Sequence, residues 1–560
     1  MIRHLLTEAG EKLSGTPWDT YPRPQMVRDN WTNLNGAWHF GTDRAVEEEI
    51  RVPFCPESLL SGIRRDFGKE KNFFYQKKFR QAKPGAGERI LLHFGAVDQA
   101  AEVFINSFYV GHHEGGYLPF EFDITEYLRE GENELFVEVR DALDHRLPWG
   151  KQKKKRGGMW YTPVSGIWQT VWLETVPKKY IKGLQISAGL NWARIRAEGV
   201  TDGLVTLEET DACYPLENGQ VRIEIEEPKN WTPGTPHLYW FTVQSGEDKV
   251  RSYFALRELS VQAVNGKKRL CLNGQPYFFN GLLDQGYFSD GIYTPASPQC
   301  YEEDILAMKS LGFNTLRKHI KVEPEQFYYD CDRLGMVVFQ DLVNNGEYHF
   351  VRETVMPTFL PGKPKDKRMH ADPEARRNFL QAMKDTVLHL KNHPCICYWT
   401  VFNEGWGQFQ ADKAYDWMLK LDRSRLIDTT SGWFHQEKSD VDSLHIYFKA
   451  LHLGDSDKPQ VLSEYGGYVW KIPDHSANTE KTYGYRIFDS REELVKALRK
   501  VFREELLPLA REGLCAAIYT QVSDVEDETN GLLTYDRKIL KVRPEELFEF
   551  GPQLQAAVRE

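Results

Sequence analysis

The chain has 560 residues, of which 71 are basic and 81 are acidic, so its net charge is −10. This mild acidity disfavours nucleic acid as the main binding partner, and the length predicts three or four domains. The sequence has no uninterrupted run of 18 apolar residues, and its first residues lack the apolar stretch of a signal peptide. We therefore expect a cytoplasmic protein that does not contact a membrane.

The eight cysteines are scattered along the chain. Only Cys395 and Cys397 are close together, as an alternate-residue pair that would share one face of a strand. This spacing is typical of small buried side chains and not of a disulfide framework or a zinc site. We expect no metal.

Short segments of alternating apolar and polar residues recur in the first third of the chain, for example at 101–106 and 134–140. Turn-rich stretches such as 83–87 separate them. This pattern predicts a β-sandwich over residues 1–176. A second, shorter β domain follows over residues 177–257.

From Glu258 onward strand and helix signals alternate, which predicts a parallel sheet built from βα units. Asp372 and Pro373 have the types expected for the N-cap and the first position of a long helix. Eight candidate strands in residues 258–560 predict a (β/α)8 barrel: 278–283, 313–317, 336–341, 395–402, 426–430, 442–447, 460–464 and 515–521.

Two of these strands end in a glutamate followed by glycine or by a glycine-containing turn. One runs into Asn403 and Glu404, and the other contains Glu464. The carboxyl ends of barrel strands meet at the mouth where substrates bind, so the two carboxylates should converge. Paired carboxylates on either side of a bond are what glycoside hydrolysis requires. A solvated strand end is the alternative for either glutamate alone.

Other strand ends also carry polar or aromatic side chains, which we expect at the same mouth: Asp284, Arg317, His319, Asp341, Trp433, His445, Tyr447 and Gln521. A basic group such as Arg317 near Glu464 would keep that glutamate ionised. The apolar neighbours Phe402 and Trp406 would instead favour a protonated Glu404. Trp406 and Trp433 are candidates either for stacking on a sugar ring or for packing at the rim.

Four stretches of the sequence resemble glycoside hydrolase family 2, the family of β-galactosidases, β-glucuronidases and β-mannosidases. They are 165–174, His393-Pro394, the 399–404 segment that ends in Asn403-Glu404, and Ser463-Glu464-Tyr465-Gly466. The resemblance implies a jelly-roll domain, an immunoglobulin-like domain and a catalytic TIM barrel, in that order. It also implies catalysis without a metal or an organic cofactor.

The same resemblance assigns roles to individual residues. Glu404 would be the acid/base and Glu464 the nucleophile of a retaining glycosidase, and Asn403 would contact the sugar 2-hydroxyl. The remaining substrate-binding candidates are Arg317, His319, Asp284, Asp341, Trp406, Trp433, His445 and Tyr447. His319 follows Arg317 by two residues, whereas the family pattern has three, so the match at His319 is loose.

Two departures from the family bear on the sugar. No Asn-x-Lys triplet, which holds the sugar carboxylate in the family's β-glucuronidases, occurs between Thr520 and the C-terminus. A tryptophan often found at the end of the last strand is also missing. We therefore expect a β-galactosidase-like exo-glycosidase that acts on an oligosaccharide or simple glycoside. β-Glucuronidase, β-mannosidase and α-L-arabinofuranosidase activities, transglycosylation and a non-catalytic carbohydrate-binding role are the alternatives. A homo-oligomer is one assembly state that the sequence allows.

A basic run at residues 151–156 lies between glycines and is predicted to be a loop. It is either a solvated loop tip or a loop that leans over the barrel mouth and meets a polar or anionic part of the substrate.

Overall fold

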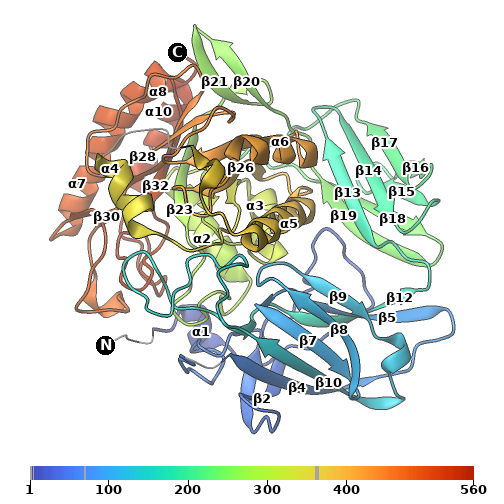
Figure 1. Ribbon diagram of the computed structural model, residues 1–560. Coiled ribbons are helices and arrows are strands. Elements are labelled where there is room, and N and C mark those ends of the chain that lie inside the picture. Colours follow the sequence, from blue (N-terminus) through green and yellow to red (C-terminus); the bar gives the residue numbers. More distant parts are fainter. Residues whose placement is uncertain (1–2, 4, 69–70, 360–364) are drawn as a thin grey trace.

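The computed structural model describes residues 3, 5–68, 71–359 and 365–560. Its three regions are visible in Figure 1, with a β-sandwich at the lower right, a second β domain at the upper right and a barrel on the left. The architecture confirms the predicted fold class.

The N-terminal region is a sandwich of two antiparallel sheets. One has the order β3 (Glu48–Val52), β2 (Gly36–Gly41), β4 (Asn72–Gln81), β10 (Gly131–Arg140), β7 (Ala100–Ile105) and β8 (Phe108–Glu114). The other has the order β1 (Trp31–Asn33), β12 (Val171–Pro177), β5 (Glu88–Phe94) and β9 (Phe120–Asp123). The short strands β6 (Val97–Asp98) and β11 (Gly166–Ile167) pair with each other. Alternate side chains such as Leu135, Val137 and Val139 fill the core between the sheets.

The second β domain also has two antiparallel sheets. One contains β13 (Gly183–Ala188), β14 (Trp192–Glu198) and β17 (Gln220–Glu224), and the other contains β16 (Cys213–Pro215), β15 (Leu204–Leu207), β18 (Tyr239–Ser245) and β19 (Asp248–Phe254). A separate small sheet of β20 (Leu259–Val264), β21 (Lys267–Leu272) and β22 (Gln275–Pro276) precedes the barrel. Buried Arg28 ties the first two domains together, because its guanidinium pairs with Glu174 and Asp248.

The barrel is a parallel sheet of eight described strands. In chain order they are β23 (Phe279–Asp284), β24 (Thr315–Lys318), β25 (Val337–Asp341), β26 (Ile396–Asn403), β27 (Leu426–Ser431), β28 (Asp442–Ile446), β29 (Gln460–Gly466) and β32 (Leu514–Thr520). Each lies within a few residues of its predicted range. The hydrogen-bonded ladder runs from β27 round to β28, and contacts between these two close the ring.

The described helices surround the barrel: α2 (Gln299–Ser310), α3 (Glu325–Leu334), α4 (Met356–Phe359), α5 (Pro373–Leu390), α6 (Ala411–Leu421), α7 (Arg491–Val501), α8 (Leu507–Glu512), α9 (Pro544–Leu547) and α10 (Phe550–Ala557). Asp372 caps α5 as predicted, by accepting hydrogen bonds from the next turn. None of the described helices is both long and apolar enough to cross a membrane. The short α1 (Glu8–Lys12) precedes the sandwich, and its N-cap Thr7 hydrogen-bonds to buried Asp290 of the barrel.

The sandwich also reaches the barrel mouth. Trp149 and Trp160 follow β10, and their rings stack with centroids 5.4 Å apart. Both pack edge-on against Trp406, which follows Glu404 by two residues. One aromatic cluster therefore joins the first domain to the turn that carries a candidate catalytic residue.

Candidate active site

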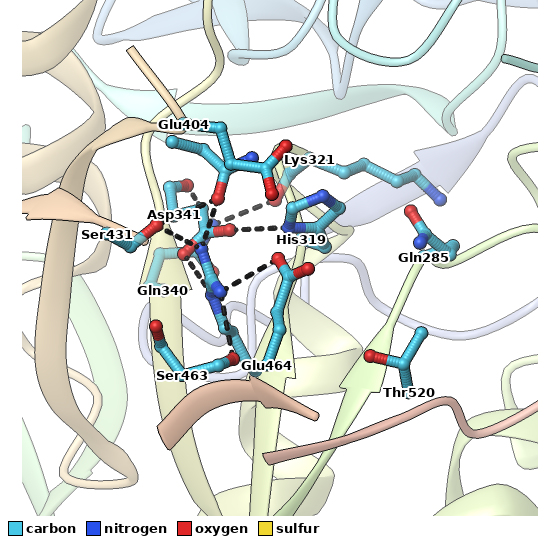
Figure 2. A network of polar contacts seen from close by, with 12 residues as sticks. Gln285, His319, Lys321, Gln340, Asp341, Glu404, Ser431, Ser463, Glu464 and Thr520 are labelled. Atoms are coloured by element: carbon cyan, nitrogen blue, oxygen red, sulfur yellow. Dashed lines mark hydrogen bonds and ion pairs between the residues drawn. The ribbon is translucent and has the colours of Figure 1, made fainter. Parts of the chain in front are cut away.

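The two predicted glutamates converge at the mouth of the barrel. Glu404 follows β26 directly, and Glu464 lies within β29. Three atoms lie within 4.8 Å of one another: a carboxylate oxygen of Glu404, a carboxylate oxygen of Glu464 and a ring nitrogen of His445. Figure 2 shows the two glutamate side chains approaching the same space from opposite sides, with His319 and Asp341 close by.

The backbone at Glu404 is in the left-handed region, with φ +53°. For a residue with a side chain, such a conformation costs about 1–3 kcal/mol and is maintained by its surroundings. Here the Glu404 N–H donates to the Ser431 carbonyl, and the Glu404 carbonyl accepts from Trp433 Nε1 at 3.1 Å. Gly405 follows at φ +74°, and a Cβ there would lie 2.1 Å from the Phe434 ring. The turn out of β26 is therefore fixed on both sides.

Glu464 is held as an anion by three groups. Its Oε1 accepts from Arg317 Nη1 at 3.0 Å, and its Oε2 accepts from the Tyr447 hydroxyl. Nδ1 of His445 lies 3.5 Å from Oε2. Burial alone would raise the pKa of Glu464, but His445, when its ring is protonated, and Arg317 lower it to about 2.

Arg317 uses every N–H group of its guanidinium. Nε donates to Asp341, Nη1 to the Ser463 carbonyl and to Glu464, and Nη2 to Asn403 and Ser431. Because a guanidinium has five donors, none remains unpaired. The buried Arg317 side chain from β24 thus fixes groups on four other strands.

Asn403 presents its amide group in a defined orientation. Its Oδ1 accepts from Arg317 Nη2 and from Ser431 Oγ, each at 2.8 Å. Since arginine can only donate, oxygen must face Arg317 and the amide NH2 must point the other way. That NH2 has no acceptor among the described residues, so it is available to a ligand.

His319 lies at the mouth despite its loose match to the family pattern. Its Nδ1 is 2.8 Å from Asp341 Oδ2, while the other oxygen of Asp341 accepts from Arg317. Burial, and then the charge of Lys151, lower the pKa of His319. Arg317 and His319 lower the pKa of Asp341 against the opposing effect of burial.

Two predicted substrate contacts lie outside this network. Asp284 is occupied by Lys318 Nζ at 2.6 Å and by the backbone N–H of Gly286. Trp406 belongs to the buried cluster with Trp149 and Trp160, and its Nε1 donates to the Gly346 carbonyl. The two alternatives for Trp406 were stacking on a sugar ring and packing at the rim. Its contacts with Trp149 and Trp160 correspond to packing. Trp433 is partly exposed and lies edge-on to His445, with centroids 5.6 Å apart.

Ser431 was not among the predicted site residues, although it hydrogen-bonds to both Arg317 and Asn403. Its position was a usable signal, since Ser431 and Gly432 directly follow the predicted strand 426–430. Gln285 and Gln521 form a buried pair in which Nε2 of Gln285 donates to Oε1 of Gln521. The second amide atom of each has no partner among the described residues.

Glu404, His445 and Glu464 also have donor atoms spaced closely enough to surround a metal ion. However, Arg317 and Tyr447 occupy the Glu464 oxygens, and His445 Nδ1 lies 2.7 Å from Glu404 Oε1. A cation at this point would compete with Arg317 for the same carboxylate. The arrangement therefore fits nucleophilic and proton-transfer chemistry better than metal binding.

Part of the basic loop is exposed to solvent and part of it contacts the barrel. Lys153, Lys154 and Lys155 are exposed, whereas Lys151 is only 7% exposed. The C-terminal end of the run leans on the barrel, because Arg156 pairs with Glu526 at 2.6 Å.

Strand-end carboxylates at the mouth of a (β/α)8 barrel, less than 5 Å apart and backed by a buried arginine, define a protein of the glycoside hydrolase class. Two family models match the chain. "Glycosyl hydrolases family 2, sugar binding domain" covers residues 65–177, and "Glycosyl hydrolases family 2, TIM barrel domain" covers residues 263–476. The chain belongs to glycoside hydrolase family 2.

Similar curated proteins carry different names. A beta-galactosidase of Thermoanaerobacter pseudethanolicus is 27% identical over 478 residues, which cover 79% of this chain and 56% of that protein. A beta-glucuronidase of Streptococcus agalactiae is 23% identical over 530 residues, covering 81% of this chain and 86% of that protein. This chain spans about half the length of the beta-galactosidases it matches.

Solved structures share the fold. A β-D-glucuronidase of Dictyoglomus thermophilum superposes with a TM-score of 0.73 at 19% identity, covering 94% of this chain and 98% of that one. A family 2 β-galacturonidase of Eisenbergiella tayi gives a TM-score of 0.69 at 20% identity, covering 95% of this chain and 98% of that one.

Proposed function

We propose that this protein is a retaining exo-glycosidase that removes a terminal sugar by double displacement. The observation that carries the proposal is the separation of less than 5 Å between oxygens of Glu404 and Glu464. Retaining enzymes place their carboxyl groups about 5–5.5 Å apart, whereas inverting enzymes need about 6.5–9.5 Å to admit a water molecule.

In the first step Glu464 attacks the anomeric carbon and Glu404 protonates the departing oxygen. Arg317 and Tyr447 keep Glu464 ionised and fix its carboxylate. The free NH2 of Asn403 would donate to the sugar 2-hydroxyl, a contact that strengthens as positive charge develops on the ring.

In the second step Glu404 removes a proton from water, and the water releases the sugar from Glu464 with the original anomeric configuration. Oε2 of Glu404 has no partner among the described residues, so this oxygen is free for proton transfer in both steps. A non-catalytic carbohydrate-binding protein would have no need for a nucleophile with a depressed pKa.

For the sugar, our first candidate is a β-galactoside. The missing Asn-x-Lys triplet supports a neutral sugar, because a buried sugar carboxylate without a cationic partner would carry an uncompensated desolvation cost. The segment after β32, where the triplet would lie, contains the acidic residue Glu528. Burial raises the pKa of Glu528, although Tyr161 and Lys151 act to lower it.

A β-glucuronide or β-galacturonide is the second candidate, and Lys151 favours it. This nearly buried ammonium lies over the Trp160 ring at 5.5 Å and pairs with none of the described carboxylates. Its positive charge, acting together with burial, lowers the pKa of His319 at the barrel mouth. A sugar carboxylate would give Lys151 a direct ionic partner in addition to the more distant charge of Glu528.

The test is a panel of aryl glycosides assayed side by side: β-galactoside, β-glucuronide, β-galacturonide, β-mannoside, β-glucoside and α-L-arabinofuranoside. We expect turnover of at least one, with the anomeric configuration of the first-formed product retained by NMR. An inverted product contradicts the mechanism. If the wild type hydrolyses none of these glycosides and Glu464→Ala gives the same result, the enzyme function is contradicted. Added alcohols separate transglycosylation from hydrolysis.

A further inference from the structure

His445 stands between the two glutamates of the site. It lies on β28, and its side chain is completely buried. We propose that His445 is a positioning residue that fixes which oxygen of Glu404 exchanges protons with the substrate and with water. This proposal rests on the function proposed above, because it concerns the same site.

The contacts of the ring assign its proton. Nδ1 lies 2.7 Å from Glu404 Oε1, whereas Nε2 faces Arg317 Nη1 at 3.5 Å. Arginine has donors only, so Nε2 must present its lone pair to Arg317. In a neutral imidazole one nitrogen carries the hydrogen, which therefore sits on Nδ1 and is donated to Glu404.

This hydrogen bond serves both forms of Glu404. When Glu404 is a carboxylic acid, Oε1 accepts from Nδ1–H and the proton stays on Oε2, towards the glycosidic oxygen. When Glu404 is a carboxylate, the same Nδ1–H stabilises its negative charge while Oε2 accepts the proton of water. Oε1 is engaged in each case, so Oε2 performs the transfer in both steps.

The second glutamate lies within reach of the same hydrogen. Oε2 of Glu464 is 3.5 Å from Nδ1, too far to compete with the bond of 2.7 Å to Glu404. When Glu464 carries the sugar its charge is lost, and Glu404 is then the one carboxylate facing His445 among the described residues. The charged groups that face the ring are Glu404 directly after β26, Glu464 on β29 and Arg317 on β24. Tyr447 lies beside it on the same segment.

The backbone makes room for this ring. Gly432 follows β27 with φ +85°, and a Cβ there would lie 2.8 Å from Nδ1 of His445. Trp433 packs edge-on against the imidazole. The close approach on this side leaves the ring little freedom to turn its nitrogens away from Glu404.

The test compares two substitutions that differ in the donor. In His445→Asn the amide NH2 can stand where Nδ1 stands, whereas His445→Leu fills similar space without a donor. His452→Leu is the matched control, because His452 is an exposed histidine that follows β28 outside the site. Each variant is assayed for kcat/KM on two glycosides of the sugar that the wild type accepts, one with a dinitrophenyl leaving group and one with an alkyl leaving group.

We expect His445→Leu to lose about 30-fold to 100-fold on the alkyl glycoside, in line with a lost hydrogen bond to a charged group, and less than about 3-fold on the dinitrophenyl glycoside. The second substrate needs little protonation, so it reports on Glu464 alone. His445→Asn should recover most of the lost activity, and His452→Leu should match the wild type. Equal losses on both substrates in His445→Leu, or no recovery in His445→Asn, would overturn the positioning role.

A readout without turnover separates this proposal from the proposed function. A buried imidazole N–H that donates to a carboxylate should give a slowly exchanging downfield proton signal in NMR spectra of the wild type. That signal should be lost in His445→Leu and retained in His452→Leu. If the signal is absent from the wild type, the tautomer is wrong even in an active enzyme. If the signal is present but no glycoside is turned over, the proposed function is contradicted, and the positioning role that depends on it is contradicted as well.

Discussion

Nη1 of Arg317 lies 3.0 Å from Oε1 of Glu464, and the two side chains are only 1% and 7% exposed. The same guanidinium holds Asn403 Oδ1 at 2.8 Å. One buried cation therefore fixes the proposed nucleophile and the proposed contact to the sugar 2-hydroxyl. Stability and activity should depend together on this residue.

Replacing Arg317 by methionine removes the only cation that directly pairs with Glu464 and Asp341 among the described arginines and lysines. Breaking a buried ion pair by removing one partner costs about 3–5 kcal/mol, because the other charge stays buried without compensation. We expect urea unfolding to show a loss of this size and activity to disappear.

The matched control is Arg511→Met. Arg511 pairs with Glu560, and both side chains are more than half exposed. A surface pair of this kind contributes about 0–1 kcal/mol. Similar losses in the two variants would mean that the Arg317 network does not carry the stability we assign to it.

Glu464 should make folding sensitive to acid. Its pKa is lowered from 4.5 to about 2 in the folded protein, so folding favours the ionised form. The resulting stabilisation is fully present above pH 4.5 and is lost as the pH falls towards 2. A shift of this size corresponds to roughly 3 kcal/mol.

Other carboxylates, Asp341 among them, also have lowered pKa values. The contribution of Glu464 is therefore obtained by comparing the free energy of unfolding of the wild type with that of Glu464→Gln. The free energy of unfolding of the wild type should fall more steeply between pH 4.5 and pH 2.5 than that of Glu464→Gln. Parallel curves would show that Glu464 is not held as a low-pKa anion.

The sequence predicted the barrel strands well because each is a short apolar run with polar residues at its carboxyl end. Burial on both faces of a parallel strand leaves this mark even in one sequence. The convergence of Glu404 and Glu464 followed from the same rule, since the carboxyl ends of barrel strands share one mouth.

The sequence did not predict the partners of these residues. The sequence left open whether Trp406 stacks on a sugar or packs at the rim, and Trp149 and Trp160 cover it from a domain more than 200 residues earlier. Likewise, nothing local to Asp284 indicated that Lys318 would occupy it. Contacts between distant segments depend on packing and on side-chain direction, which periodicity does not encode.

Lys151 provides a test of the sugar. We expect kcat/KM for the aryl β-glucuronide to be lower than for the β-galactoside, because the Asn-x-Lys triplet is missing and Glu528 is near Lys151. If the wild type instead prefers the glucuronide, Lys151→Met should abolish that preference and leave the β-galactoside within about 10-fold. Lys155→Met, which alters an exposed lysine of the same loop, is the control.

The two glutamates should separate by role. Glu464→Ala should abolish turnover of every glycoside, since no other described group stands where the covalent bond forms. Glu404→Ala should still be glycosylated by a dinitrophenyl glycoside, because a good leaving group needs little protonation, but it lacks the base for the second step and should accumulate the glycosyl-enzyme.

Azide, a nucleophile that needs no deprotonation, should then restore turnover in Glu404→Ala. With a β-glycoside it should give the β-glycosyl azide, because two displacements retain the configuration. In Glu464→Ala azide would occupy the space of the lost carboxylate, attack the intact substrate once and give the α-anomer. Mass spectrometry of the trapped intermediate and NMR of the azide product distinguish these outcomes. The reverse pattern would exchange the roles of Glu404 and Glu464, and unchanged activity in both variants would place the reaction elsewhere on the protein.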